Sequence, residues 1–364
     1  MGNRLIYKRL GHYIQQVDVR NKDLAVDRLL GLSIAKQFIP SIANTTGTDM
    51  STYKIVQPRQ FGYVPVTSRN GDKITIALYD GESLCIISQA YVVFEVIDET
   101  ELLPEYLMMW FRRPEFDRYA RFKSHGSARE VFEWSEMCEV MLPVPPIEEQ
   151  RKIVAEYQAI EQRIENNCRL IATIEETAKT IYRKMFVDDI DTENLPEGWR
   201  MGTIGELFKL QRGHDLPSQN RIAGKYPIYA STGINGYHNK FKAEAPCVVT
   251  GRSGTIGVVN YVTKDFWPLN TTLFVKDCAK SSMEFAYFKL KDLKLENLVA
   301  GFAAVPTLNR NDIHMMQCSI PPYSLIVDFS KCSQFFFSYI ENVQKEITHL
   351  ESLKSIIFFK LSKL

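Results

Sequence analysis

The sequence predicts a mixed α/β (α+β) fold in which two globular bodies and two long antiparallel coiled-coil helices form a pseudo-twofold internal repeat. Pro145-Pro146 and Pro321-Pro322 lie 176 residues apart, and a long amphipathic segment follows each pair. The register is kept along both segments, because Ile164-Glu165-Asn166 recurs as Ile340-Glu341-Asn342. A chain built from two copies of one unit favours a partner with two similar or spaced sites, and double-helical DNA is the obvious candidate.

The repeat divides the chain into four segments. The two bodies are expected at residues 1–145 and 195–320, the first helix with its acidic linker at 146–194, and the second helix at 321–364. Short apolar runs bounded by turn residues predict strands at 74–78, 84–87 and 91–96 in the first body and at 246–250, 257–262 and 272–275 in the second. A short helix is expected after each set, at 104–112 and 283–290.

The two long helices give the clearest local pattern. Apolar residues recur by fours and threes over more than four heptads, which is the a/d seam of a coiled coil and too narrow and long for two unrelated surface helices. Proline is tolerated in the first turn of a helix but not in its interior, so each proline pair marks a helix start. The predicted seam residues are Ile153, Tyr157, Ile160, Ile164, Asn167, Ile171 and Ile174 in the first helix and Phe329, Phe336, Ile340, Val343, Ile347 and Leu350 in the second.

Composition restricts the class of protein. The chain has no run approaching the ~18–20 apolar residues of a membrane span, and its N-terminus has no apolar run typical of a signal peptide. The seven cysteines are scattered and never form a C-x-x-C pair, which argues against both a disulfide framework and a metal cluster. These features predict a cytoplasmic protein with no membrane segment.

Charge is distributed unevenly between the two bodies. Residues 1–145 carry 17 basic and 18 acidic side chains, whereas residues 196–320 carry 15 basic and 10 acidic ones. If DNA is the partner, its basic contacts must therefore be local patches rather than a field over the whole protein.

No catalytic set stands out, and the chain is predicted to be non-catalytic and to hold no metal or cofactor. Pro321-Pro322-Tyr323 follows Ile320, whereas the similar core of amino-methyltransferases needs Asp, Asn or Ser at that position. The glycine-rich segment 251–257 lies between two strand-like runs, whereas nucleotide-binding loops need a following helix. It is expected to be a hairpin that presents Arg252.

Polar and basic segments that are expected to be loops, such as residues 121–126, interleave with aromatic residues in both bodies, a combination that suits contacts with DNA phosphates and base edges. Each residue alone is compatible with an ordinary solvated surface group, but two matched sets on a repeat favour DNA. The predicted DNA-binding residues are Lys36, Lys54, Arg59, Tyr63, Arg69, Lys73, Arg121, Lys123, Ser124 and Arg129 in the first body and Arg212, Tyr229, Ser231, Thr232, Lys240, Arg252, Ser253, Asn309 and Arg310 in the second.

Three stretches carry a resemblance to a known family. They are the Pro-x-Pro-Pro-Ile-Glu-Glu-Gln-Arg-Lys-Ile run at 143–153, the Leu-Pro-Glu-Gly-Trp run at 195–199 and the segment 305–313. With the order body, helix, body, helix, the chain resembles the specificity subunit (S subunit) of type I restriction-modification enzymes over essentially its whole length. The first body lacks the Leu-Pro-Glu-Gly-Trp run, so its start is less well defined.

The resemblance implies two target recognition domains, each reading one half of a bipartite, asymmetric site in double-stranded DNA. It implies that two modification subunits and the restriction/translocase subunits carry the chemistry and bind S-adenosylmethionine, ATP and Mg. Two other readings remain open: a coiled-coil scaffold that presents two α/β domains to a partner other than DNA, and an enzyme with diverged motifs.

Overall fold

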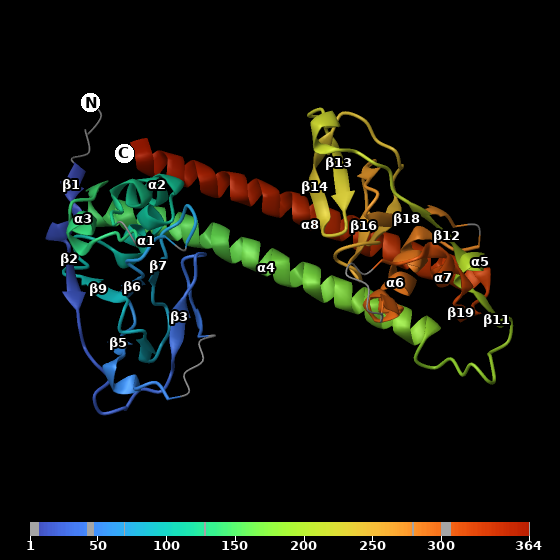
Figure 1. Ribbon diagram of the computed structural model, residues 1–364, viewed down its shortest axis with the longest axis horizontal. Coiled ribbons are helices and arrows are strands. Elements are labelled where there is room, and N and C mark those ends of the chain that lie inside the picture. The colour runs from blue at the N-terminus through green and yellow to red at the C-terminus, as the bar shows by residue number, and fades with distance from the viewer. Residues whose placement is uncertain are drawn as a thin grey trace. The chain divides into compact units, whose positions relative to one another are not determined.

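The computed structural model describes residues 7–41, 47–68, 70–126, 129–278, 280–299 and 307–363 (Figure 1). The chain forms two compact units: unit 1 comprises Met1–Asn166 and Glu346–Leu364, and unit 2 comprises Asn167–Lys345. Each unit therefore contains one body together with a segment of each long helix. The predicted segments assign each long helix to one copy of the repeat. The two compact units instead change within the helices, at Asn166/Asn167 and at Lys345/Glu346.

Each unit is built around a four-stranded antiparallel sheet, and the strand order is the same in both. Numbered along the chain, the four strands of each sheet follow the order first, fourth, second, third. The sheet of unit 1 consists of β2 (Ile14–Val17), β9 (Val92–Val96), β6 (Phe61–Tyr63) and β7 (Ile76–Leu78). The sheet of unit 2 consists of β12 (Lys209–Arg212), β18 (Thr272–Asp277), β15 (Cys247–Gly251) and β16 (Val259–Val262). The predicted internal repeat is thus present in the backbone topology.

The remaining short elements surround these sheets. Unit 1 adds the pairs β1 (Tyr7–Arg9) with β10 (Met141–Pro143), β3 (Leu30–Leu32) with β4 (Phe38–Pro40), and β5 (Lys54–Val56) with β8 (Cys85–Ile87), and the helices α1 (Pro104–Phe111), α2 (Pro114–Lys123) and α3 (Trp134–Cys138). Unit 2 adds β11 (Arg200–Thr203) with β19 (Gln317–Ile320), the sheet of β14 (Gly233–His238), β13 (Tyr226–Ala230) and β17 (Trp267–Pro268), and the helices α5 (Ile204–Leu207), α6 (Met283–Asp292) and α7 (Arg310–Met315).

All six predicted strands and both predicted short helices are present, with ends within two residues of the expected ones. One local prediction is wrong: the basic segment beginning at Arg121 was expected in a loop, but Arg121, Phe122 and Lys123 form the last turn of α2. This helix starts with Pro114 at its first position and buries Phe116 and Ala120, so tertiary burial rather than the polar composition decides its conformation.

Aromatic side chains dominate both cores. In unit 1 the rings of Phe61 and Phe94 stack with centroids 4.7 Å apart, and Phe111 of α1 meets Phe61 edge-on at 5.9 Å. In unit 2, Phe285 of α6 packs against Phe186, with ring centroids 5.0 Å apart. Burying each of these side chains stabilises the fold by roughly 1.5–3 kcal/mol.

The long helices are α4 (Ile147–Phe186) and α8 (Tyr323–Lys363), and each begins directly after a proline pair (Figure 1). Gln150 fixes the start of α4, because its fully buried amide donates to the carbonyls of Glu101 (2.8 Å) and Pro145 (2.9 Å) and accepts from the Leu103 N–H (2.9 Å). The position 176 residues later is Ile326, which is also fully buried. The same place in the repeat is therefore held by hydrogen bonds in unit 1 and by apolar packing in unit 2.

Within unit 1 the two helices run antiparallel. Tyr157 faces Phe358, with ring centroids 5.4 Å apart, while Arg163, further along α4, pairs at 2.7 Å with Glu346, which lies earlier on α8. The thirteen predicted seam residues are all buried or half-buried. Asn167 is 3% exposed, and its Nδ2 has no hydrogen-bond partner within the part of the chain that the structure describes.

Candidate nucleic-acid interface

Three loops of unit 2 meet at one end of its four-stranded sheet. They are the β13–β14 turn at 231–232, the glycine-rich segment 251–257 and the segment 307–310 that leads into α7, and together we call them the loop cluster. The N–H of Leu308 donates to the Arg252 carbonyl at 2.8 Å, and Ser253 forms an antiparallel bridge with Thr307. Segments about 20 and 50 residues from Arg252 thus lie beside it.

Close packing of the backbone explains a glycine in this cluster. A Cβ placed on Gly251 would lie 1.9 Å from the Thr255 carbonyl oxygen and 3.2 Å from Cβ of Ser231. A side chain at this position would collide with the backbone of the same hairpin, so glycine allows the β13–β14 turn to pack against it. The segment is a turn between β15 and β16, as predicted, and it holds Arg252 half-buried.

Among the described residues, no carboxylate neutralises the basic side chains of the cluster. Arg252 is half-buried and Arg310 is exposed at the first position of α7, and the described ranges place no carboxylate within 4.0 Å of either guanidinium. Asn309 caps α7, because its side-chain oxygen accepts from the Asn311 N–H at 3.0 Å. The cluster therefore presents two cations, the three hydroxyl groups of Ser231, Thr232 and Ser253, and an amide, which suits binding to phosphates and base edges.

The structure brings together six of the nine residues predicted for the second body: Ser231, Thr232, Arg252, Ser253, Asn309 and Arg310. Arg212 lies at the same end of the sheet, because it pairs with Leu273 while the neighbouring Gly251 pairs with Thr272. Tyr229 is half-buried against Phe266, at 5.4 Å between ring centroids, and burial raises the pKa of its hydroxyl. Lys240 is exposed beyond the end of β14.

The predicted contacts of the first body are distributed differently. Five of the basic residues have carboxylate partners: Lys36 with Asp117 (2.7 Å), Lys54 with Asp18 (3.5 Å), Arg59 with Glu99 (2.7 Å) and Glu105 (2.6 Å), Arg121 with Glu130 (2.7 Å) and Lys123 with Glu136 (3.0 Å). Ser124 donates to the Ala120 carbonyl at 2.7 Å. Lys73 and Arg129 are exposed and have no carboxylate partner among the described residues. Arg69 lies outside the described residues.

Two of these predictions are wrong in this structure. Tyr63 is fully buried in the central sheet, and burial raises the pKa of its hydroxyl, so it offers no surface to DNA. Lys36 is only 6% exposed and points inward to Asp117. Sequence gives the residue type in both cases, but the direction of the side chain depends on strand pairing and on the positive φ of +62° at Lys36.

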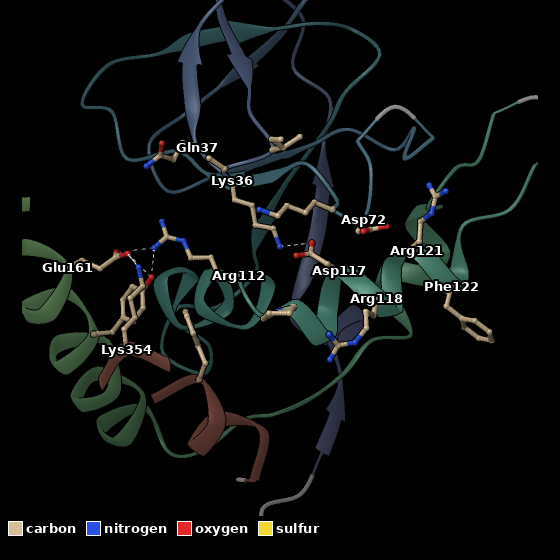
Figure 2. A pocket seen from close by; sticks show the side chains of 16 residues that line it. Lys36, Gln37, Asp72, Arg112, Asp117, Arg118, Arg121, Phe122, Glu161 and Lys354 are labelled. Atoms are coloured by element: carbon tan, nitrogen blue, oxygen red, sulfur yellow. Dashed lines mark hydrogen bonds and ion pairs between the residues drawn. The ribbon is translucent and has the colours of Figure 1, made fainter. Parts of the chain in front are cut away.

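A pocket of about 940 Å³ opens in unit 1 between the β3–β4 turn, α2 and the long helices (Figure 2). On its helix side, Arg112 donates to the Tyr157 hydroxyl at 2.8 Å and pairs with Glu161 at 2.9 Å. Lys354 pairs with Glu161 at 2.6 Å, and the Tyr157 hydroxyl donates to the Glu161 carboxylate at 2.7 Å. Burial alone would raise the pKa of Glu161, but the bonds from Lys354, Tyr157 and Arg112 outweigh burial and hold it below its usual value.

Sequence reasoning missed several residues of this pocket. Phe122 lines it and is 80% exposed, and Gln37 and Arg118 also line it, yet none of the three is among the predicted DNA-binding residues. The available signal was a phenylalanine flanked by Arg121 and Lys123, which is unusual for a helix residue that packs in a core.

No helix within the described residues is long and apolar enough to cross a membrane.

Comparisons with known proteins identify the relatives of the chain. A family model described as the type I restriction modification DNA specificity domain matches residues 39–176 and 196–352. The MjaIX specificity subunit of a type I restriction enzyme from Methanocaldococcus jannaschii is 24% identical over 302 residues, which is 73% of this chain and 70% of that protein.

Solved structures show the same fold. The crystal structure of a type I restriction-modification S subunit from M. genitalium has a TM-score of 0.66 and 16% identity, covering 99% of this chain and 97% of that one. A structure described as the basis of complex assembly and conformational transition of a type I R-M system has a TM-score of 0.50 and 17% identity, covering 99% of both chains. Specificity subunits are the non-catalytic, DNA-recognising components of such systems. Because the family model matches most of the chain in two regions, one in each copy of the repeat, this protein belongs to the family of type I restriction-modification DNA specificity proteins.

Proposed function

We propose that this chain reads a bipartite, asymmetric site in double-stranded DNA, with each body reading one half. Residues 1–145 and 195–320 would be the two target recognition domains, and residues 146–194 and 321–364 would carry the spacer helices. The observation that carries the proposal is the loop cluster of unit 2, where Arg252 and Arg310 stand without a carboxylate partner in the described part of the chain. Cations that no carboxylate neutralises are available to pair with the phosphates of a DNA backbone.

The chemistry of the cluster supports sequence reading as well as simple attraction. An arginine can donate two parallel hydrogen bonds to O6 and N7 of guanine or to a phosphate. The hydroxyls of Ser231 and Thr232 can both donate and accept, so they fit either a base edge or a phosphate oxygen. Lys73 and Arg129 are the corresponding candidates in unit 1.

The remaining parts of the system would be supplied by other chains in the cytoplasm. Two modification subunits, one for each copy of the repeat, would bind S-adenosylmethionine, and restriction/translocase subunits would use ATP and Mg. The twofold repetition of sheet and helix supports two equivalent seats for a partner. The exposed aromatic residues of α8, such as Phe335, are candidates for one seat.

Salt dependence of DNA binding tests this proposal. The complex with its modification subunit would first be used to define the recognised motif from the methylated sites of expressing cells. Binding to a duplex carrying that motif would then be measured over a series of salt concentrations. Arg252→Ala and Arg310→Ala should each weaken binding and reduce the slope of log K against log salt by about 1.

Lys264→Ala is the matched control. Lys264 is an exposed cation of the same unit near the opposite end of the β15–β16 pair, where Cys247 pairs with Val262. It removes the same charge, so it should leave the slope nearly unchanged. An equal effect of Lys264→Ala and Arg252→Ala would contradict an interface at the loop cluster, and a salt-insensitive complex would favour the scaffold.

A further inference from the structure

The β3–β4 hairpin of unit 1 ends in a tightly closed turn over residues 33–37. Leu32 pairs with Phe38, the Ser33 N–H donates to the Gln37 carbonyl at 3.0 Å, and the Lys36 N–H donates to the Ser33 carbonyl at 2.9 Å. Lys36 takes a left-handed backbone conformation, with a φ of +62°, which is costly for a side chain with a Cβ. The turn is therefore held in one conformation, although the left-handed backbone of Lys36 is unfavourable for that residue.

The side chain of Lys36 supplies the constraint. It is 6% exposed, and its Nζ lies 2.7 Å from Asp117 of α2 (Figure 2). It also donates to the carbonyl of Phe111. Asp117 in turn accepts from the Ile74 N–H at 3.1 Å. One buried ion pair thus ties together the hairpin tip, the junction of α1 and α2 and the segment that enters β7.

This tie is a poor source of stability. Taking both charges out of water costs several kcal/mol per ion, and apolar residues of similar volume often stabilise a fold as well or better. Burial lowers the pKa of the Lys36 ammonium, which shows that the surroundings disfavour its charge despite Asp117. What the ion pair provides instead is a fixed position for the hairpin tip relative to α2.

The groups that the tip presents are suited to base edges. Ile34 is 53% exposed and Gln37 is exposed, and both line the pocket. A glutamine amide can bond N6 and N7 of adenine, and an aliphatic side chain can contact the methyl group of thymine. Lys73 and Arg118 line the same pocket and are exposed. Arg118 pairs with Glu115 at 3.2 Å, whereas Lys73 has no carboxylate partner among the described residues, so Lys73 is the cation beside these groups that is available to a phosphate.

We propose that residues 33–37 form a base-reading element of unit 1, in which Gln37 and Ile34 contact base pairs of one half-site and Lys36 is a positioning residue that acts through Asp117. This inference rests on the proposed function and deepens it for unit 1. It also replaces the predicted role of Lys36 as a direct DNA contact.

The test uses the full complex and the methylation motif that it produces. Gln37→Ala and Ile34→Ala should relax the preference at one or two base pairs of a single half-site, by roughly tenfold to a hundredfold for the glutamine. Lys36→Met should relax the same base pairs, although it touches no DNA. The other half-site should keep its sequence in all three variants, so it serves as an internal control for assembly and folding.

Gln15→Ala is the matched control for Gln37→Ala. Gln15 is an exposed glutamine of β2 in the same unit, and its amide donates to Glu95 at 2.8 Å. It should leave both halves of the motif intact. If Lys36→Met fails to fold, Gln37→Ala and Ile34→Ala still decide the matter: an unaltered motif in both overturns the base-reading element while leaving the proposed function in place. A wild-type complex that recognises no motif would instead overturn the proposed function.

Discussion

Units 1 and 2 share a sheet topology but hold their helices by different forces. The pocket wall of unit 1 consists of Arg112, Tyr157, Glu161 and Lys354, all linked by hydrogen bonds and ion pairs. At the corresponding place in unit 2, Tyr182 lies among rings, with centroids 5.6 Å from Phe288 and 5.8 Å from Phe329 and Phe285. A repeat can thus keep its backbone topology while exchanging a polar network for aromatic packing at the same place.

The same contrast holds for the surfaces. Most of the candidate basic residues of unit 1 are paired with carboxylates, whereas Arg252 and Arg310 of unit 2 have no such partner in the described ranges. This agrees with the nearly even numbers of acidic and basic side chains in residues 1–145 and the excess of basic ones in residues 196–320. We therefore expect unit 2 to contribute more of the salt-dependent affinity for DNA. DNA binding by unit 1 should depend more on how its surface fits the bases than on charge.

Truncating the aromatic contact between helix and body should have the largest effect. Phe329 is 1% exposed and meets Tyr182, Phe186 and Phe288. Phe329→Ala should lower the free energy of unfolding of unit 2 by about 3–5 kcal/mol, since it removes a large buried ring and leaves a cavity. Phe358 of unit 1 is half-buried, so Phe358→Ala should cost clearly less. Chemical denaturation measures both, and equal losses would contradict the comparison.

A single substitution at two tyrosines should have opposite consequences. Tyr157→Phe removes a hydroxyl that accepts from Arg112 and donates to Glu161, and should cost about 1–3 kcal/mol. Tyr182→Phe removes a buried hydroxyl that has no hydrogen-bond partner among the described residues, so it should be neutral or stabilise unit 2 by up to about 1 kcal/mol. Thermal melts of the two variants give the sign directly, and destabilisation by both would show that Tyr182 has a partner in solution.

Sequence alone accounts for the parts of this fold that depend on period and chain breaks. The helix starts follow from the proline pairs, the seam from the heptad pattern, and the six strands from apolar runs. The β3–β4 hairpin is absent from the prediction, because Gly31 and Pro40 weaken the strand pattern of its apolar runs and its geometry depends on the inward turn of Lys36. Ion pairs such as Arg59 with Glu105 join residues far apart in the chain, so local patterns could not show that Arg59 is neutralised.

The polar seam residue Asn167 offers a smaller test. The sequence predicts that Asn167→Leu stabilises the helix pair but loosens its alignment, because a buried amide fixes register at some cost in stability. Its Nδ2 has no partner among the described residues, so about 1 kcal/mol of stabilisation is expected in a thermal melt. Spin labels on Cys168 and Cys332, which are exposed on α4 and α8 in unit 2, should report a broader distance distribution in the variant. Clear destabilisation would contradict the prediction, and Asn166→Leu, an exposed neighbour, is the control.

A fall in pH should distinguish the two units by the smallest margin. The pKa of Glu161 lies below its usual value in the folded protein, because its bonds to Lys354, Tyr157 and Arg112 outweigh burial. A carboxylate with a depressed pKa stabilises the fold above its unfolded pKa of about 4.3, and that stability is lost as the pH falls through the folded value. Unfolding free energies measured from about pH 7 to about pH 3 should therefore fall more steeply for the wild type than for Glu161→Gln. Glu176→Gln, an exposed glutamate of α4 in unit 2 that pairs with Lys179 three residues along the same helix, should keep the wild-type slope. Parallel curves for wild type and Glu161→Gln would mean that the pocket wall of Arg112, Tyr157, Glu161 and Lys354 contributes no pH-dependent stability. Its role would then be to fix the positions of the side chains around the pocket, as the Lys36 ion pair does on the opposite side of the same pocket.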